Sequence, residues 1–266
     1  MDFSGKVCVV TGASSGIGRR VAQVLAGRGA RVCVAARRGD RLEALVAEIG
    51  GAGAGHSWVV TDVSKKADVD SLRDHVQAAY GRCHVLVNNA GFSTGSRFDS
   101  GAVRRIEAVM ATNFLGAVNC TGSFLPLLEE SAPSHVVNIA SVAGRMPVPG
   151  DGGYCASKFA LVGWSESIHY DLAERGVHVS IVEPGPVRTE GFPLTDLAAD
   201  KWLRHALTTQ DRVAAAIVKV IERPRLERVV PRWFYLLRVP YVVAPWLFHA
   251  AQHHFVRERA LTPSRV

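Results

Sequence analysis

Short apolar runs alternate with longer stretches of helical periodicity along most of the chain. The runs at residues 6–12, 30–37 and 56–63 are rich in valine, cysteine and alanine, and helical patterns occupy residues 18–29 and 41–50 between them. The runs lack a strict polar alternation, which is typical of strands covered by helices on both faces of a parallel sheet. This strand–helix–strand–helix–strand order restricts the chain to an α/β fold.

The same alternation continues for another hundred residues. Further strands are predicted within residues 84–91, 135–141 and 178–185, and helices near residues 102–130 and 154–175. Strands that regularly alternate with helices build a doubly wound sheet. The predicted fold class is therefore α/β, a Rossmann-like doubly wound parallel sheet with helices on both faces, in a single domain.

The end of the chain differs from this pattern. We expect residues 1–231 to form the catalytic domain, closing with a helix at 211–222 and a short strand at 228–231, and residues 232–266 to form an apolar, basic C-terminal extension. Residues 186–207 lack periodicity and are rich in Pro, Thr, Gly and Asp, so they are predicted to be a mobile cover over the substrate site.

Composition and charge exclude several classes of protein. Hydrophobic residues make up 48% of the chain and charged ones 21%, a balance typical of globular domains. The first strand begins near Lys6, which leaves no room for a signal peptide, so a cytoplasmic protein is expected. Residues 223–266 contain eight Arg and two Glu, +6 of the formal +7, so the rest is nearly neutral and no nucleic-acid partner is expected.

The five cysteines show no spacing that suits a metal or a disulfide framework. Cys8 and Cys33 lie within predicted strands, where a reduced thiol behaves as a small buried apolar group. No metal site is predicted.

A glycine-rich turn follows the first strand and opens the first helix. Residues 11–18 read TGASSGIG, which places glycines where backbone must approach a pyrophosphate and directs a helix N-terminus toward the anion. The strand-to-helix context favours a nucleotide site over an ordinary turn. The residues predicted to contact the nucleotide here are Gly12, Ser14, Ser15, Gly16, Ile17 and Gly18.

The spacing TGxxxGxG resembles the short-chain dehydrogenase/reductase family, and further motifs match that family in order across roughly residues 5–190. These are Asp62 with Val63, the NNAG segment at 88–91, Asn113, Ser141, Tyr154 with Lys158, and Pro184 with Gly185. The resemblance implies a homo-oligomer, either a dimer or a tetramer. It also implies cofactor contacts from Asp62, Val63, Asn89, Ala90, Gly91, Tyr154, Lys158, Pro184, Gly185, Val187 and Thr189.

The end of the second strand decides which dinucleotide is bound. An acidic residue there would bond the ribose hydroxyls of NAD, but this chain has Arg37 and Arg38. A guanidinium can hold the extra 2′-phosphate in bidentate fashion, which favours NADP(H). The alternative is that both arginines are merely solvated at a loop.

Tyr154 and Lys158 lie four residues apart in a predicted helix, so they project from one face. A neighbouring ammonium favours the phenolate, which lets Tyr154 move a proton. By resemblance, Ser141 bonds the substrate oxygen, Asn113 helps to hold a water chain to the lysine, and Lys158 bonds the cofactor ribose. The chain is thus predicted to be an oxidoreductase that interconverts a carbonyl and a secondary alcohol, with catalytic residues Asn113, Ser141, Tyr154 and Lys158.

The segment 233–248 is apolar but is interrupted by Arg238, Pro240 and Pro245, and it is shorter than the ~20 residues of a spanning helix. Its aromatic residues beside arginines predict peripheral membrane contact, or else a cover over the active site or a subunit interface. Each of these alternatives favours a lipophilic substrate such as a steroid, a retinoid or a long-chain keto compound. A different class also stays open, a regulatory or scaffolding protein that binds NADP(H) without turnover.

Overall fold

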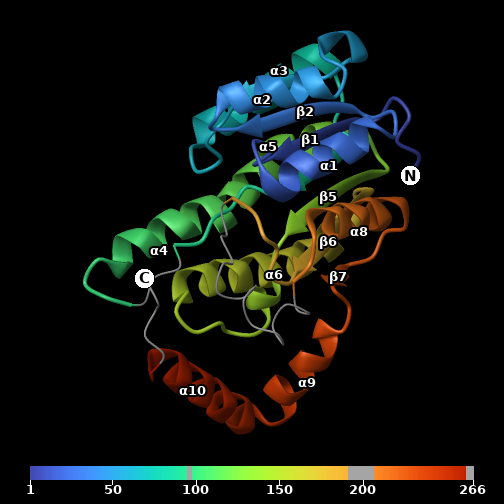
Figure 1. The fold of residues 1–266 in the computed structure, drawn as a ribbon. Coiled ribbons are helices and arrows are strands. Elements are labelled where there is room, and N and C mark those ends of the chain that lie inside the picture. The colour runs from blue at the N-terminus through green and yellow to red at the C-terminus, as the bar shows by residue number, and fades with distance from the viewer. Residues whose placement is uncertain (95–97, 191–206, 262–266) are drawn as a thin grey trace.

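The computed structural model describes residues 1–94, 98–190 and 207–261. Seven strands form one parallel sheet in the order β3-β2-β1-β4-β5-β6-β7. The strands are β1 (Val7–Thr11), β2 (Arg31–Ala36), β3 (Ser57–Val60), β4 (Val85–Asn88), β5 (Ser134–Ile139), β6 (Val177–Pro184) and β7 (Glu227–Val230). The predicted doubly wound parallel sheet is confirmed (Figure 1).

Helices cover both faces of the sheet, and the central strands β1, β4 and β5 are buried on both faces, whereas Trp58 and Val60 of the edge strand β3 are exposed. The helices of this layered body are α1 (Gly16–Ala26), α2 (Gly39–Glu48), α3 (Lys66–Tyr80), α4 (Ala102–Met110), α5 (Gly116–Glu130), α6 (Gly152–Ala173) and α8 (Gln210–Glu222). One core packs α1, α2 and α8 against the sheet, and the other packs α3, α5 and the end of α6. In β1, Cys8 and Val10 enter the first core while Val7 and Val9 enter the second, which accounts for the run without polar alternation.

The strand order reverses between β1 and β4, which are hydrogen-bonded neighbours. In open α/β sheets the connections on either side of this switch point diverge and leave a crevice beyond the carboxyl ends of the strands. The glycine-rich turn leaves β1 there and the NNAG segment leaves β4 there, so the fold places two of the predicted motifs side by side.

Residues 102–130 are helical throughout, as predicted, but the α-helix is interrupted in the middle by a turn with a different hydrogen-bonding pattern. A π-helical turn, η2 (Ala111–Leu115), joins α4 to α5. Such turns widen the backbone ring and often occur at functional sites. Asn113 lies within this turn and is buried.

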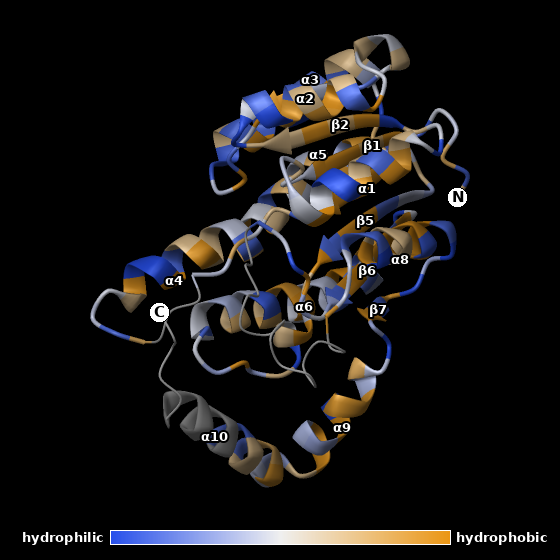
Figure 2. Cartoon of the chain, in the orientation of Figure 1, coloured by the Kyte–Doolittle hydropathy of each residue, from blue (hydrophilic) through white to orange (hydrophobic). Residues whose placement is uncertain are grey.

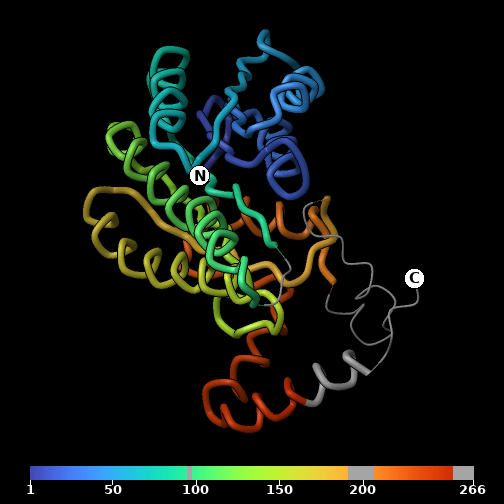
Figure 3. The backbone as a smooth tube through the Cα atoms, turned by 90° about the vertical axis from the view of Figure 1, so that its left-hand side faces the viewer, coloured from blue at the N-terminus to red at the C-terminus, as the bar shows by residue number. Residues whose placement is uncertain are grey.

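The C-terminal segment forms two helices outside the layered body, α9 (Phe234–Val243) and α10 (Pro245–Leu261) (Figures 1 and 3). Pro245 begins the second helix, and none of the described helices is long and apolar enough to cross a bilayer. Gln252 of α10 donates to the carbonyl of Pro147 at 2.7 Å, so the segment returns to the body. Most of the predicted mobile cover, residues 191–206, lies outside the described residues.

Two arginines of the basic region 223–266 lie at the other end of a strand from the apolar helix. Arg223 and Arg225 precede β7, whereas α9 follows it. A strand separates its two ends along the sheet, so these arginines lie away from the apolar helix.

Candidate active site

A cavity of about 600 Å³ lies at the carboxyl ends of the central strands. It is lined by parts of the glycine-rich turn, the end of β2, the NNAG segment, the turn after β5, helix α6 and the segment after β6. Of all the residues predicted to bind a cofactor or to act in catalysis, Gly18 and Asn113 are absent from its wall, and each of these two packs directly against residues that form it.

Two glycines of the first turn allow close contact between β1 and β4. Gly12 has φ +66°, and a Cβ there would lie 2.7 Å from the Cα of Ala90. A Cβ on Gly18 would overlap the side-chain amide of Asn89 and would lie 2.6 Å from the carbonyl oxygen of Gly12. No larger residue fits either position without moving backbone, so these glycines are required by packing as well as by turn geometry.

Thr11 joins the same two motifs and was not singled out from the sequence. Its hydroxyl accepts from the backbone N–H groups of Asn89 at 3.0 Å and Ala90 at 3.1 Å, and it donates to the carbonyl of Val87. Asn89 returns a bond from Nδ2 to the Thr11 carbonyl at 2.9 Å. These contacts fix the register of the NNAG segment against the glycine-rich turn.

The two arginines after β2 differ in their surroundings. The guanidinium of Arg38 donates to the hydroxyls of Ser14 at 3.0 Å and Ser15 at 2.8 Å, and it pairs with Glu190 at 3.2 Å. Arg37 also lines the cavity, and its charge acts on Asp62. Arg38 thus lies directly over the glycine-rich turn.

Asp62 follows β3 and forms a small polar cluster with Ser64, whose backbone N–H and hydroxyl both donate to Oδ1. Partial burial alone would raise the pKa of this carboxyl, but the Ser64 hydrogen bonds and the charges of Arg37 and Lys65 outweigh it and lower the pKa. The neighbouring Val63 packs against Gly116, the first residue of α5.

Ser141 and Tyr154 come from two different elements, and their side chains are hydrogen-bonded in the cavity wall. Ser141 caps the short turn η3 (Val142–Gly144), accepting from Ala143 N at 3.1 Å and donating to the carbonyl of Pro184 at 3.4 Å. Tyr154 lies in the first turn of α6. Burial raises the pKa of the Tyr154 hydroxyl to about 12, although its hydrogen bond with Ser141 acts in the opposite direction.

Lys158 lies one turn further along α6 and is buried. Its Nζ donates to the carbonyl of Ile139 at 2.7 Å and lies 5.7 Å from the centre of the Tyr154 ring. Burial lowers the pKa of this ammonium to about 8. A charged group held with so little solvent is a common sign of a functional site.

Asn113 supports this arrangement from the π-helical turn. Its side chain makes a two-way pair with the backbone of Phe92, at 2.9 Å in each direction, and donates to the Ser157 hydroxyl at 3.0 Å. A Cβ on Gly91 would lie 3.1 Å from Asn113 Oδ1 and 3.5 Å from Lys158 Nζ, so Gly91 leaves the space between them open.

Thr189 and Val187 extend the wall after β6. Val187 is buried and pairs in a bridge with Thr208, and the Thr189 side chain lies 3.3 Å from the position that a Cβ on Gly16 would take. The segment after Pro184 therefore passes beside the glycine-rich turn. Only the family resemblance, which assigns both Gly16 and Thr189 to the cofactor, implied that they lie near each other, because the two residues are more than 170 positions apart in the sequence.

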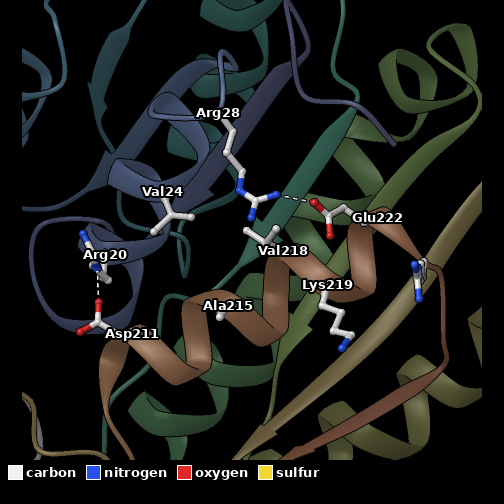
Figure 4. A pocket seen from close by; sticks show the side chains of 9 residues that line it. Arg20, Val24, Arg28, Asp211, Ala215, Val218, Lys219 and Glu222 are labelled. Carbon is white, nitrogen blue, oxygen red and sulfur yellow. Dashed lines mark hydrogen bonds and ion pairs between the residues drawn. The ribbon is translucent and has the colours of Figure 1, made fainter.

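A second groove lies between α1 and α8, on the far side of the first core (Figure 4). Its side chains pair across the groove, Arg20 with Asp211 and Arg28 with Glu222. These pairs hold the two helices together, and the groove contains none of the predicted site residues.

Comparison with known proteins agrees with this geometry. The family model described as short chain dehydrogenase matches residues 6–196. The chain belongs to the short-chain dehydrogenase family. It is 32% identical to the ketoacyl reductase HetN of Nostoc sp. over 229 residues, 86% of this chain and 79% of that protein.

Two solved structures that match this chain contain different cofactors. A short-chain dehydrogenase/reductase of Burkholderia phymatum in complex with NAD matches with a TM-score of 0.79, 30% identity and 91% and 94% coverage of the two chains. An RhlG/NADP complex of Pseudomonas aeruginosa matches with a TM-score of 0.78, 26% identity and 88% and 99% coverage. Both relationships support an oxidoreductase fold that binds a nicotinamide dinucleotide, and they leave the choice between NAD and NADP open.

Proposed function

We propose that the protein is an NADP(H)-dependent oxidoreductase that interconverts a carbonyl and a secondary alcohol on a lipophilic substrate. The observation that supports this most strongly is that Ser141, Tyr154 and Lys158 line the same cavity as the glycine-rich turn. The proposal is tested by following NADPH oxidation over a panel of carbonyl compounds with the wild-type protein and a Tyr154→Phe variant.

The residues of the cavity suit a dinucleotide. The turn that starts at Gly12 leads into the N-terminus of α1 at Gly16, where free backbone N–H groups favour a pyrophosphate. Asp62 and Val63 line the cavity beyond β3, and we assign the adenine end to them. The nicotinamide end would lie against Pro184, Gly185, Val187 and Thr189, together with Asn89, Ala90 and Gly91 on the other side.

In this mechanism, bound NADPH would supply the hydride. The Tyr154 hydroxyl donates the proton to the substrate oxygen, and Ser141 bonds the same oxygen and polarises the carbonyl. Lys158 places positive charge near the phenol, which stabilises the phenolate left behind. Asn113 acts by fixing the backbone of Phe92 beside Gly91, which also lies close to the lysine.

We propose that Arg38 is the main residue that recognises the 2′-phosphate and that Arg37 assists it. Arg38 is already aimed at Ser14 and Ser15, so a phosphate bound between the hydroxyls and the guanidinium would gain charge-assisted bonds. Glu190 also pairs with Arg38 and Arg41, and a phosphate would compete with this carboxylate.

Arg38→Asp is expected to shift cofactor preference from NADP toward NAD by about 100-fold in the ratio of kcat/KM values, because the variant loses a phosphate partner and adds repulsion. The matched control is Arg41→Asp, which also removes a partner of Glu190 but lies in the first turn of α2, outside the cavity wall. Equal shifts in the two variants, or an unchanged preference after Arg38→Asp, would assign recognition to Arg37 or Ser14.

The lipophilic character of the substrate rests on the C-terminal helices. Their exposed side chains are largely apolar, and Gln252 ties α10 to the loop at Pro147, next to Val148 in the cavity wall. A keto compound with a long apolar tail would therefore pass from the cavity to an apolar surface. The relationship to a ketoacyl reductase supports the same substrate class.

A regulatory protein that binds NADP(H) without turnover is the second candidate. It is favoured by the burial of Tyr154, which raises the pKa of the hydroxyl to about 12 and so opposes the phenolate that the alcohol-oxidation direction requires. Stoichiometric NADPH binding without oxidation by any member of the carbonyl panel would establish this alternative.

We also propose that α9 and α10 rest on an anionic lipid surface. Leu236, Val239, Val242, Val243 and Trp246 are each more than half exposed, and hydropathy colouring shows α9 as an apolar projection (Figure 2). Residues 232–266 carry five Arg and one Glu, so the charge of the segment complements an anionic bilayer.

Binding to vesicles that contain anionic lipid is expected to fall at least tenfold in a Val243→Glu/Trp246→Glu variant, since two charges would enter the headgroup boundary. Tyr170→Glu, an equally exposed aromatic position on α6, is the matched control and should bind normally. Sedimentation measures binding, and light scattering on the same samples measures the self-association that the family resemblance implies. If neither form binds vesicles and only oligomer size changes, the helices form a subunit interface instead.

A further inference from the structure

The first residue of α9 lies against the wall of the candidate active site. Phe234 is buried, whereas most other large apolar side chains of this helix are exposed. A Cβ built on Gly185 would lie 2.8 Å from Cε2 and 3.1 Å from Cζ of the Phe234 ring. Gly185 lines the cavity and donates from its backbone N–H to the Val230 carbonyl at 2.7 Å. The ring therefore supports, from outside, the backbone that forms the cavity wall.

An ionic network holds α9 in this position. Arg238, one turn after Phe234, pairs with Glu227 of β7. Arg145 lies 3.5 Å from the same Glu227 carboxylate and pairs with Glu183 of β6 at 2.7 Å and with Glu166 of α6 at 2.6 Å.

The network ends at two residues next to the catalytic serine. Arg145 directly follows the η3 turn that Ser141 caps. Glu183 directly precedes Pro184, whose carbonyl accepts the Ser141 hydroxyl at 3.4 Å. The Arg145–Glu183 pair thus spans the same two segments as the Ser141–Pro184 hydrogen bond.

Separating the charges of Arg145 and Glu183 would cost free energy, because both side chains are largely shielded from solvent. The side chain of Glu183 is 0% exposed and that of Arg145 13%. Burial and the neighbouring Glu227 carboxylate raise the pKa of Glu183 to about 7, against the attraction of Arg145. Removing Arg145 would leave the buried Glu183 carboxyl without its partner, so the pair resists disruption.

We propose that helix α9 is a positioning element of the active site, in which Phe234 supports Gly185 and the Arg238–Glu227–Arg145–Glu183 network holds the helix against the Ser141 turn. The proposal rests on the proposed function, because it takes Gly185 to be a cofactor contact and Ser141 to be catalytic. According to this proposal, the part of the C-terminal extension that forms α9, Phe234–Val243, helps to position the active site of the catalytic domain.

A double-mutant cycle between Gly185 and Phe234 tests the contact, with the dissociation constant of NADPH measured by fluorescence titration as the readout. Phe234→Ala alone is expected to weaken NADPH binding about fivefold, because the support is lost. Gly185→Ala in the wild type should weaken it at least tenfold, since the new methyl displaces the ring. Gly185→Ala added to Phe234→Ala should cost at least fivefold less than it does in the wild type.

Two controls separate positioning from general stability. Leu236→Ala truncates an exposed residue of the same helix and should leave NADPH affinity unchanged, and Phe234→Leu should restore most of the affinity lost in Phe234→Ala.

A separate variant tests the ionic network. Arg238→Gln is expected to weaken NADPH binding about threefold. Its control, Arg175→Gln, breaks the exposed Arg175–Glu129 pair elsewhere and should leave NADPH binding unchanged.

The outcomes are distinct. A cost of Gly185→Ala that is the same in both backgrounds overturns the proposed contact, and an unchanged affinity of Arg238→Gln overturns the ionic link. Absence of NADPH binding by the wild type would instead refute the proposed function. Melting temperatures taken with and without NADPH check folding, since a merely structural defect lowers both equally and leaves the stabilisation by the cofactor intact.

Discussion

Tyr154→Phe is expected to lower turnover with NADPH about 10³-fold while the dissociation constant of NADPH stays within about twofold. The substitution removes one hydroxyl, which carries the proton in the proposed reaction, and leaves the ring in place. Initial rates over the carbonyl panel and fluorescence titration measure the two quantities. Tyr170→Phe, the same change at an exposed position of the same helix, should be silent in both.

The pKa of Tyr154 also predicts how the reaction rate in each direction depends on pH. Burial raises it to about 12 in the cofactor-free protein, so the hydroxyl is protonated at neutral pH and can donate during carbonyl reduction. Alcohol oxidation needs the phenolate, so its rate should rise with pH until the pKa in the complex is passed. Bound NADP⁺ should lower that pKa through its positive nicotinamide ring.

Phenolate absorbance, taken as the difference between wild type and Tyr154→Phe, reports this ionisation directly. The midpoint should lie near 12 without cofactor and lower with NADP⁺. Near-normal turnover of the phenylalanine variant, or a midpoint that NADP⁺ leaves unchanged, would contradict the assigned role.

The local motifs of the site were predictable because each depends on a short segment. Val7 to Gly18 has one strand, one turn and one helix, and the positions of Gly12 and Gly18 follow from the need for close backbone approach. The spacing of Tyr154 and Lys158 likewise follows from one helix. The sheet was predictable for a related reason, since burial on both faces imposes a nearly continuous apolar run on central strands such as β1 and β4.

Contacts between distant segments were not predictable in this way. Phe234 and Gly185 meet because β7 ends beside β6, and nothing in the composition of the extension distinguishes Phe234 from its exposed neighbours. Arg145 and Glu183 lie in a loop and a strand, where a single charged residue normally indicates solvent exposure. The π-helical turn at Asn113 also lacks a periodic signature, because it inserts one residue into an otherwise regular helix.

Lys158→Met is expected to lower turnover by about 10³-fold and to weaken NADPH binding by about tenfold, because it removes both the charge beside Tyr154 and a donor toward the ribose. Methionine has a similar length and no charge, so the cavity wall is retained. The pH dependence of affinity provides an independent check. The wild-type ammonium, with its pKa lowered to about 8, loses its proton above that pH, so NADPH affinity should fall as pH rises through 8.

The Lys158→Met substitution should not destabilise the cofactor-free protein at pH 7, although it lowers turnover about 10³-fold. Burial lowers the pKa of Lys158 in the folded protein, so the folded state binds this proton less readily than the unfolded chain does. The buried ammonium therefore reduces the free energy of unfolding. This reduction is fully present below pH 8 and disappears above the ordinary lysine pKa of 10.5. The reduction is at most on the order of 3 kcal/mol, against about 1 kcal/mol for the lost bond to the Ile139 carbonyl. Lys158→Met should therefore melt at or above the wild-type temperature at pH 7, with the advantage shrinking as pH approaches 10.5. A variant that is destabilised by more than about 1 kcal/mol, or whose NADPH affinity still falls above pH 8, would show that Lys158 is a structural residue and that another group titrates at the cofactor site.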